Sequence, residues 1–150
     1  KSISKKTLAD KACEIEIDIV KQPIGKQDQY ATAYGGLNII KFRPNGNTLV
    51  ERITNKKVIN FLKENLIIIN TGMRKDNNIV LREQKKNIKK GKIFFEHLRF
   101  MKNSVFDFKS ALLKRDIKVC GEILHENWSK KKELAKRIAN KNNPFRRTEY

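Results

Sequence analysis

The chain has 150 residues, and at that length a domain buries about 70% of the surface that its unfolded form exposes, so the chain is long enough to fold around a core. Lysine and arginine number 34 against 16 acidic residues, which gives a formal net charge of +18. No apolar run approaches the roughly 18 residues that a membrane-spanning helix needs, and no cleavable signal is visible. We therefore expect no membrane partner and a cytoplasmic location.

The positive charge raises the question of nucleic-acid binding, because clustered Lys and Arg displace counterions from phosphates. The basic pairs and short runs are spread along the whole chain, at 5–6, 56–57, 85–86, 89–90, 130–132 and 146–147. They come with no aromatic platform and no recognisable nucleic-acid-binding motif. A bias toward Lys, Asn and Ile explains the charge without a binding function, and a basic, non-catalytic nucleic-acid-binding protein stays open as the alternative from a different class.

The first predicted element is a helix over residues 7–20, which Thr7 can cap. Its expected inward positions lie at helical spacing, at Leu8, Ala12, Ile15 and Ile19. Pro23 ends this helix, and the turn that Pro23 and Gly25 make leads into a short helix with Asp28 near its start.

A β-hairpin is predicted next. Residues 37–42 form an apolar run, Asn45-Gly46 is a strong hairpin turn signal, and residues 48–53 alternate in the manner of a strand. Residues 55–65 then read as a short helix. The run LIIIN at 66–70 predicts a buried strand.

The second half of the chain is predicted to be helical, with helices at about 78–90, 94–114 and 117–140. The last two helices are expected to pair as an antiparallel hairpin. Cys13 and Cys120 lie far apart in separate predicted helices, so we interpret both as reduced packing thiols.

The strongest functional signal is the run GKQDQYATAYGG at 25–36. From spacing alone Asp28 is either the N-cap of the short helix or an ionised acid that can accept a proton, and both interpretations are open. The run resembles the motif around the catalytic acid of GHMP-type small-molecule kinases. It is most similar to the branch that acts on D-glycero-D-manno-heptose 7-phosphate. TGMR at 71–74 and LHENW at 124–128 also resemble that branch.

This resemblance implies an α+β fold with two domains, a ribosomal-S5-like N-terminal domain and a ferredoxin-like, helix-rich C-terminal domain, with the active site in the cleft between them. We expect residues 1–63 to be the C-terminal portion of the first domain and residues 64–150 an incomplete second domain. The family's Gly/Ser-rich ATP-binding loop and its second Gly-rich segment are missing from these residues. We therefore expect a central fragment that has no kinase turnover on its own, since backbone donors around the phosphates carry much of such catalysis.

The resemblance also implies ATP-dependent phosphorylation of a sugar or sugar phosphate, with Asp28 as the base and Mg²⁺ as the metal. Glu16, twelve residues before Asp28, is spaced like the family's metal-binding glutamate and is expected to be partly buried. Gly25 would let a sugar approach the backbone, and Lys26 and Arg74 would meet a substrate phosphate. Each residue keeps a structural alternative, which is a helix cap for Asp28, a turn for Gly25 and a solvated charge for the others.

The implied substrates are ATP and D-glycero-D-manno-heptose 7-phosphate, a precursor of the nucleotide-activated heptose of surface polysaccharide. Another sugar kinase of the same superfamily, related to galactokinase or fucokinase, is the nearest alternative. Tyr30 and Tyr34 are expected to pack beneath the site.

Overall fold

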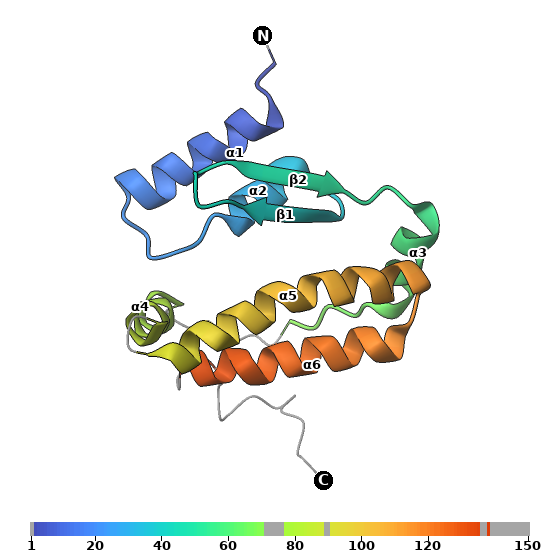
Figure 1. Cartoon of the computed structure of the whole chain (residues 1–150). Coiled ribbons are helices and arrows are strands. Elements are labelled where there is room, and N and C mark those ends of the chain that lie inside the picture. The colour runs from blue at the N-terminus through green and yellow to red at the C-terminus, as the bar shows by residue number, and fades with distance from the viewer. Residues whose placement is uncertain (1, 71–76, 89–90, 136–137, 139–150) are drawn as a thin grey trace. The chain divides into compact units, whose positions relative to one another are not determined.

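The computed structural model of the chain describes residues 2–70, 77–88, 91–135 and 138. This part of the chain is mainly helical and includes a small two-stranded antiparallel sheet (Figure 1). The chain divides into two compact units, residues 1–60 and residues 61–150. The α+β prediction is confirmed in this coarse form.

The first helix, α1 (Lys5–Cys13), begins two residues before the predicted start. Ser4 is its N-cap, with extended backbone (ψ 149°) and a side chain that accepts a hydrogen bond from the Thr7 backbone N–H at 3.0 Å. The prediction that Thr7 caps the helix is therefore wrong. The residue outside the first turn is the one whose side chain is free to reach a backbone donor, and that residue is Ser4.

The predicted single helix over residues 7–20 is also not regular, because α1 continues into a π-helix, η1 (Glu14–Ile19). Lys21 follows in the left-handed region (φ 60°). That conformation turns the chain so that the Gln22 N–H donates back to the Glu16 carbonyl at 2.9 Å. The widened turn thus ends at a defined point, and the main chain of Glu16 is held there.

The side of α1 that is buried is not the predicted one. Ala9 and Cys13 are buried, whereas Leu8 is 51% exposed, and Ile15 and Ile19 are 51% and 66% exposed. Ala9 and Cys13 also lie four residues apart on one helix face. Their small side chains give room for Tyr30 of the next helix, with which they form the buried cluster of this unit.

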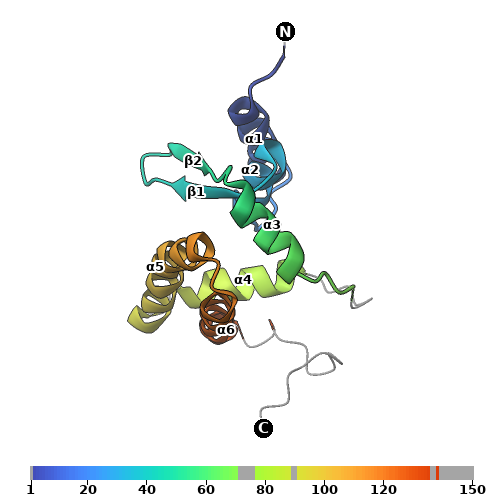
Figure 2. The same cartoon turned by 90° about the vertical axis from the view of Figure 1, so that its right-hand side faces the viewer.

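The next helix is α2 (Gln27–Tyr34), which ends at Gly35, where the positive φ (62°) favours glycine. The predicted hairpin is confirmed as β1 (Asn38–Phe42) paired with β2 (Thr48–Arg52), with Gly46 at φ 81° in the turn. Figure 2 shows α1 and α2 on the same face of this hairpin.

The core of unit 1 lies between the two helices and the hairpin. Ile40 of β1 and its cross-strand partner Val50 of β2 pack against the buried cluster. The Tyr30 ring stacks on the Tyr34 ring at 6.1 Å between centroids and meets the edge of the Phe42 ring at 5.4 Å. Packing of both tyrosines, as predicted, fixes α2 against the rest of the unit.

Helix α3 (Lys56–Asn65) is also found as predicted, and the Asn55 side chain accepts from the Lys57 backbone N–H at 2.9 Å. The strand predicted at 66–70 is wrong. These residues form no regular element, and Ile67 and Ile68 are 85% and 98% exposed. A strand needs a paired neighbour to satisfy its backbone groups. Within the described part of the chain, β1 and β2 pair only with each other.

Unit 2 contains α4 (Asn77–Ile88), α5 (Lys92–Lys114) and α6 (Ile117–Leu134). The last two lie side by side as the predicted antiparallel pair (Figures 1 and 2). The pair turns at Arg115, which adopts the left-handed conformation (φ 60°). Asp116 then caps α6 by accepting from the Val119 backbone N–H at 3.0 Å.

Polar contacts set the register of this helical pair. The buried His97 lies 2.8 Å from Glu133, and the buried Ser104 hydroxyl accepts a hydrogen bond from the Asn127 amide at 2.7 Å. His97, nearer the start of α5, contacts a residue near the end of α6, and Ser104, farther along α5, contacts a residue nearer the start of α6. This order of contacts is that of an antiparallel pair. Cys120 is buried on α6, so both cysteines are free thiols in packed positions, as expected.

Candidate active site

Asp28 is the second residue of α2 and is exposed. The N-cap of this helix is Lys26 (φ −90°, ψ −3°), so the interpretation of Asp28 as the N-cap is wrong. Among the described residues Asp28 has no hydrogen-bond or ion-pair partner. A carboxylate in the first turn of a helix is stabilised by the positive end of the helix dipole. Asp28 is therefore an accessible acid that no described residue pairs.

The Glu16 side chain lies close to the start of α2, where a side chain of that helix hydrogen-bonds to it. The Gln29 amide Nε2 donates to Glu16 Oε2 at 2.6 Å. Gln29 directly follows Asp28, so this bond connects the segment of α2 that carries Asp28 to the π-helix that carries Glu16. The Glu16 side chain is exposed, not partly buried as expected. Of the two isoleucines that flank it, Ile15 is also exposed and Ile17 packs against the buried cluster.

Gln29 is buried, with 7% of its surface exposed, and only half of its amide is used. Its Oε1 has no hydrogen-bond partner among the described residues. A buried acceptor without a partner costs about 1–3 kcal/mol. The amide cannot reverse its two ends to remove this cost, since a carboxylate only accepts hydrogen bonds.

A second polar contact joins α2 to α1. The Tyr30 hydroxyl donates to Asp10, whose other oxygen accepts from Lys6 Nζ at 2.6 Å. The Lys6 bond, and after it the Tyr30 bond, lowers the pKa of the Asp10 carboxyl below its usual range. Burial and the bond to Asp10 raise the pKa of the Tyr30 phenol. The two pKa shifts mean that Asp10 stays ionised to lower pH and Tyr30 stays protonated to higher pH than the free side chains do.

Gly25 is exposed in the loop before α2 and does not need a glycine's backbone freedom. Its φ lies outside the left-handed region, and a Cβ added there would meet only the Gln27 side chain at 3.5 Å, an ordinary contact. The turn alone therefore does not require a glycine. Lys26 is exposed beside it and contributes, after the nearer groups, to lowering the pKa of Asp10. Arg74 lies outside the described residues.

The Glu16 and Asp28 carboxylates are suitable ligands for a magnesium ion that is bound partly by the protein and partly by a substrate. Mg²⁺ takes oxygen ligands and is usually bound by one or two carboxylates together with substrate phosphates and water. Glu16 Oε1 has no partner within the described residues, so it is available to such an ion. In the same part of the chain, no three His, Cys, Asp or Glu side chains gather as a metal-binding group. The residues fit a cation shared with phosphates and not one in an all-protein cage.

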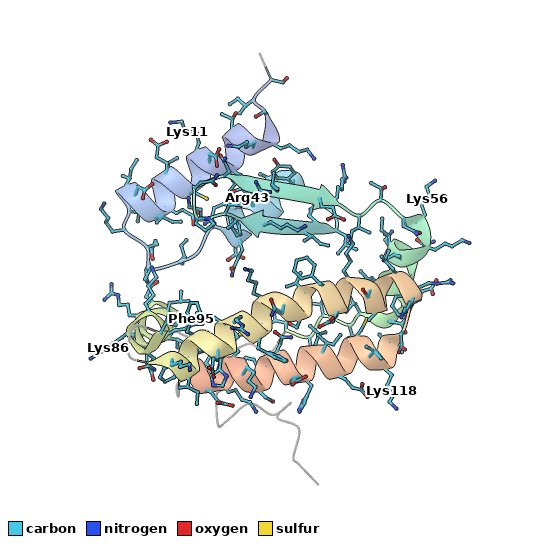
Figure 3. The ribbon with its side chains drawn as sticks, in the orientation of Figure 1. Lys11, Arg43, Lys56, Lys86, Phe95 and Lys118 are labelled. Atoms are coloured by element: carbon cyan, nitrogen blue, oxygen red, sulfur yellow. The ribbon has the colours of Figure 1, made fainter. Side chains whose placement is uncertain are left out.

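The basic side chains do not gather on one element. Lys11, Lys86 and Lys118 project from three different helices (Figure 3). In the part of the chain that is described, no helix is long and apolar enough to cross a membrane.

Sequence patterns singled out Asp28 and Glu16 but missed Gln29, which connects their segments, and Asp10, which joins α1 to α2 through Tyr30. Gln29 and Asp10 lie on elements separated by a turn, and helical periodicity carries no information about which side chains meet across it. The only available signal was the position of Gln29 within the GKQDQY run.

Comparison with curated proteins relates the chain to the GHMP kinases, at the level of distant homology. The relative is the D-glycero-alpha-D-manno-heptose 7-phosphate kinase of Campylobacter jejuni subsp. jejuni, to which the chain is 26% identical over 134 residues. The match covers 89% of this chain, and the chain spans 39% of the length of that kinase. No family model and no solved structure matches the chain.

Proposed function

We propose that this chain carries part of the phosphoryl-transfer site of an ATP-dependent sugar kinase whose acceptor is a heptose 7-phosphate. Two findings together support the proposal. The chain is distantly homologous to a heptose 7-phosphate kinase, and its two candidate acids lie on segments joined by the hydrogen bond from Gln29 to Glu16.

In this proposal Asp28 orients the acceptor hydroxyl and takes its proton as the oxygen attacks the γ-phosphorus of ATP. The bond from that phosphorus to the bridging oxygen of the β-phosphate breaks, and ADP leaves. Phosphoryl transfer depends mainly on positioning and on charge stabilisation, so one well-placed acid is a sufficient base. An exposed carboxylate that no described residue pairs is free for this role. Glu16 would hold Mg²⁺, which when bound neutralises phosphate charge.

Substrate contacts are assigned to the loop before α2. The absence of a side chain at the exposed Gly25 would let the sugar approach the main chain, and the exposed Lys26 would meet a phosphate oxygen. Arg74 is proposed as a second phosphate contact, because a guanidinium can make two parallel hydrogen bonds to phosphate.

The proposal extends to the domains. Residues 1–63 would be part of a ribosomal-S5-like N-terminal domain, and residues 64–150 part of a ferredoxin-like domain, a division close to the boundary between the two compact units. The 150 residues alone contain no glycine-rich phosphate loop. We therefore propose that they do not turn over by themselves.

The experiment is a substrate panel on the intact gene product. ADP release with Mg²⁺ is measured with D-glycero-D-manno-heptose 7-phosphate, galactose and fucose as acceptors. We expect kcat/KM to be highest for the heptose phosphate. Preferred turnover of galactose or fucose would instead favour the other sugar-kinase branches, and no ADP release with any acceptor would contradict the proposed function.

A further inference from the structure

We propose that Gln29 is a positioning residue that holds the Glu16 carboxylate in place for a divalent cation. This inference deepens the proposed function and rests on it. It concerns a residue to which neither the resemblance nor the homology gives a role.

Glu16 is held at both its main chain and its side chain. Its main-chain carbonyl accepts from the Gln22 N–H at 2.9 Å, and its Oε2 accepts from Gln29 Nε2 at 2.6 Å. An exposed glutamate otherwise samples several rotamers. The bond from Gln29 restricts this side chain, and Oε1, which has no partner among the described residues, is available to a ligand.

Within the described residues, only the Nε2 end of the buried Gln29 amide has a partner. A buried side chain that serves packing or stability alone is normally satisfied at both ends, and an unsatisfied buried group calls for another explanation. Gln29 leaves Oε1 without a partner among the described residues while Nε2 bonds the carboxylate. Its placement is explained by what it does to Glu16.

Gln29 links the two segments that carry the acids. It directly follows Asp28 in α2, and its buried side chain bonds to Glu16, whereas Asp28 is exposed. The hydrogen bond from Gln29 to Glu16 in η1 therefore holds Glu16 in place relative to the segment that carries Asp28. Hydrogen-bond partners of metal ligands commonly act in this way.

The test uses the intact gene product with the non-hydrolysable nucleotide AMP-PNP, and it measures Mn²⁺ affinity from the EPR signal of free Mn²⁺. Gln29→Met keeps the length of the side chain and removes both polar ends. We expect it to weaken Mn²⁺ binding by about 10–100-fold. Gln27→Met is the matched control, because Gln27 is an exposed glutamine in the same helical turn, and it should leave the affinity unchanged.

Two further variants separate this inference from the proposed function. If Glu16→Gln weakens Mn²⁺ binding but Gln29→Met behaves like its control, Glu16 is a metal ligand and the inference about Gln29 is overturned. If Glu16→Gln has no effect, the proposed metal role itself fails. In the double variant, Gln29→Met should add no further loss, because Gln29 acts through Glu16; an additional loss would indicate general structural damage and would overturn the inference.

Gln29→Asn provides the test should Gln29→Met not fold, which a circular dichroism melt would reveal. Asn keeps a polar amide at the buried position, but its side chain is one methylene shorter and no longer reaches Glu16 Oε2. Mn²⁺ binding should weaken in this variant as in Gln29→Met. An affinity equal to that of the parent would show that residue 29 does not act on the cation site.

Discussion

Replacing Tyr30 by Phe removes one hydroxyl from the core that fixes α2. The Tyr30 side chain is 2% exposed, and its hydroxyl donates to Asp10. The ring contacts with Tyr34 and Phe42 do not involve the hydroxyl and should persist in the variant. The change therefore tests the polar contact between α1 and α2 with almost no change in packed volume.

The expected cost follows from the environment of Asp10. A hydrogen bond to a charged group contributes about 1.5–3 kcal/mol. The Asp10 side chain is 46% exposed and stays paired with Lys6 at 2.6 Å, so water and Lys6 still solvate the carboxylate after the hydroxyl is lost. With this screening, we expect Tyr30→Phe to lower the free energy of unfolding by about 1–2 kcal/mol.

The assay is urea denaturation at pH 7, followed by circular dichroism. Tyr34→Phe is the matched control, because its hydroxyl has no hydrogen-bond partner in the described residues, and it should change stability by less than about 0.5 kcal/mol. Equal stabilities for the two variants would refute the reasoning. A loss of about 3–5 kcal/mol would also refute it, since that is the size of a lost aromatic ring.

The same contact predicts how the stability difference depends on pH. The pKa of Asp10 is lowered from 3.8 in the folded state, so its contribution is present above that value and is lost as the pH falls through the folded pKa. The pKa of Tyr30 is raised from 10.0, so its contribution is present below that value and is lost as the pH rises through the folded pKa. The difference in free energy of unfolding between the parent and Tyr30→Phe should therefore become smaller at low pH and at high pH.

Two further variants test the loop before α2 and the helical pair. Gly25→Ala should leave stability unchanged or raise it by up to about 1 kcal/mol, because no left-handed conformation is needed there. It should nevertheless raise the KM of the intact enzyme for the sugar phosphate, and an unchanged KM would argue against substrate contact at Gly25. Asp116→Ala removes the cap of α6 and should cost about 0.5–2 kcal/mol in urea denaturation. Ser129→Ala, near the other end of the same helix, serves as the comparison, and an equal effect of the two changes would contradict the capping role.

Elements with strong local signals were predictable from the sequence. Asn45-Gly46 fixed the hairpin, because a two-strand pairing across such a turn needs no distant partner. The α5–α6 pair was likewise evident, since its apolar spacing extends over many turns. The conformation of residues 66–70 was not predictable, because an apolar run becomes a strand only when another strand pairs with it.

For the candidate site, the sequence predicted where Asp28 lies along the chain but not what surrounds it. Its place near the start of a short helix is found in the structure, although Lys26 and not Asp28 is the cap. The π-helical form of residues 14–19 has no simple sequence pattern, and it sets the position of Glu16. The bond from Gln29 to Glu16 depends on that geometry, so it could only be seen in three dimensions.

The measurement that tests the central proposal most directly is the turnover of Asp28→Asn in the intact gene product. Asn keeps the shape of the side chain and cannot accept the proton, so kcat should fall about 10²–10⁴-fold while AMP-PNP binds as in the parent. Asp18→Asn is the matched control, because Asp18 is an exposed acid on the neighbouring π-helix, and it should keep the parent kcat. Equal kcat values for Asp28→Asn and Asp18→Asn would contradict the assignment of Asp28 as the base.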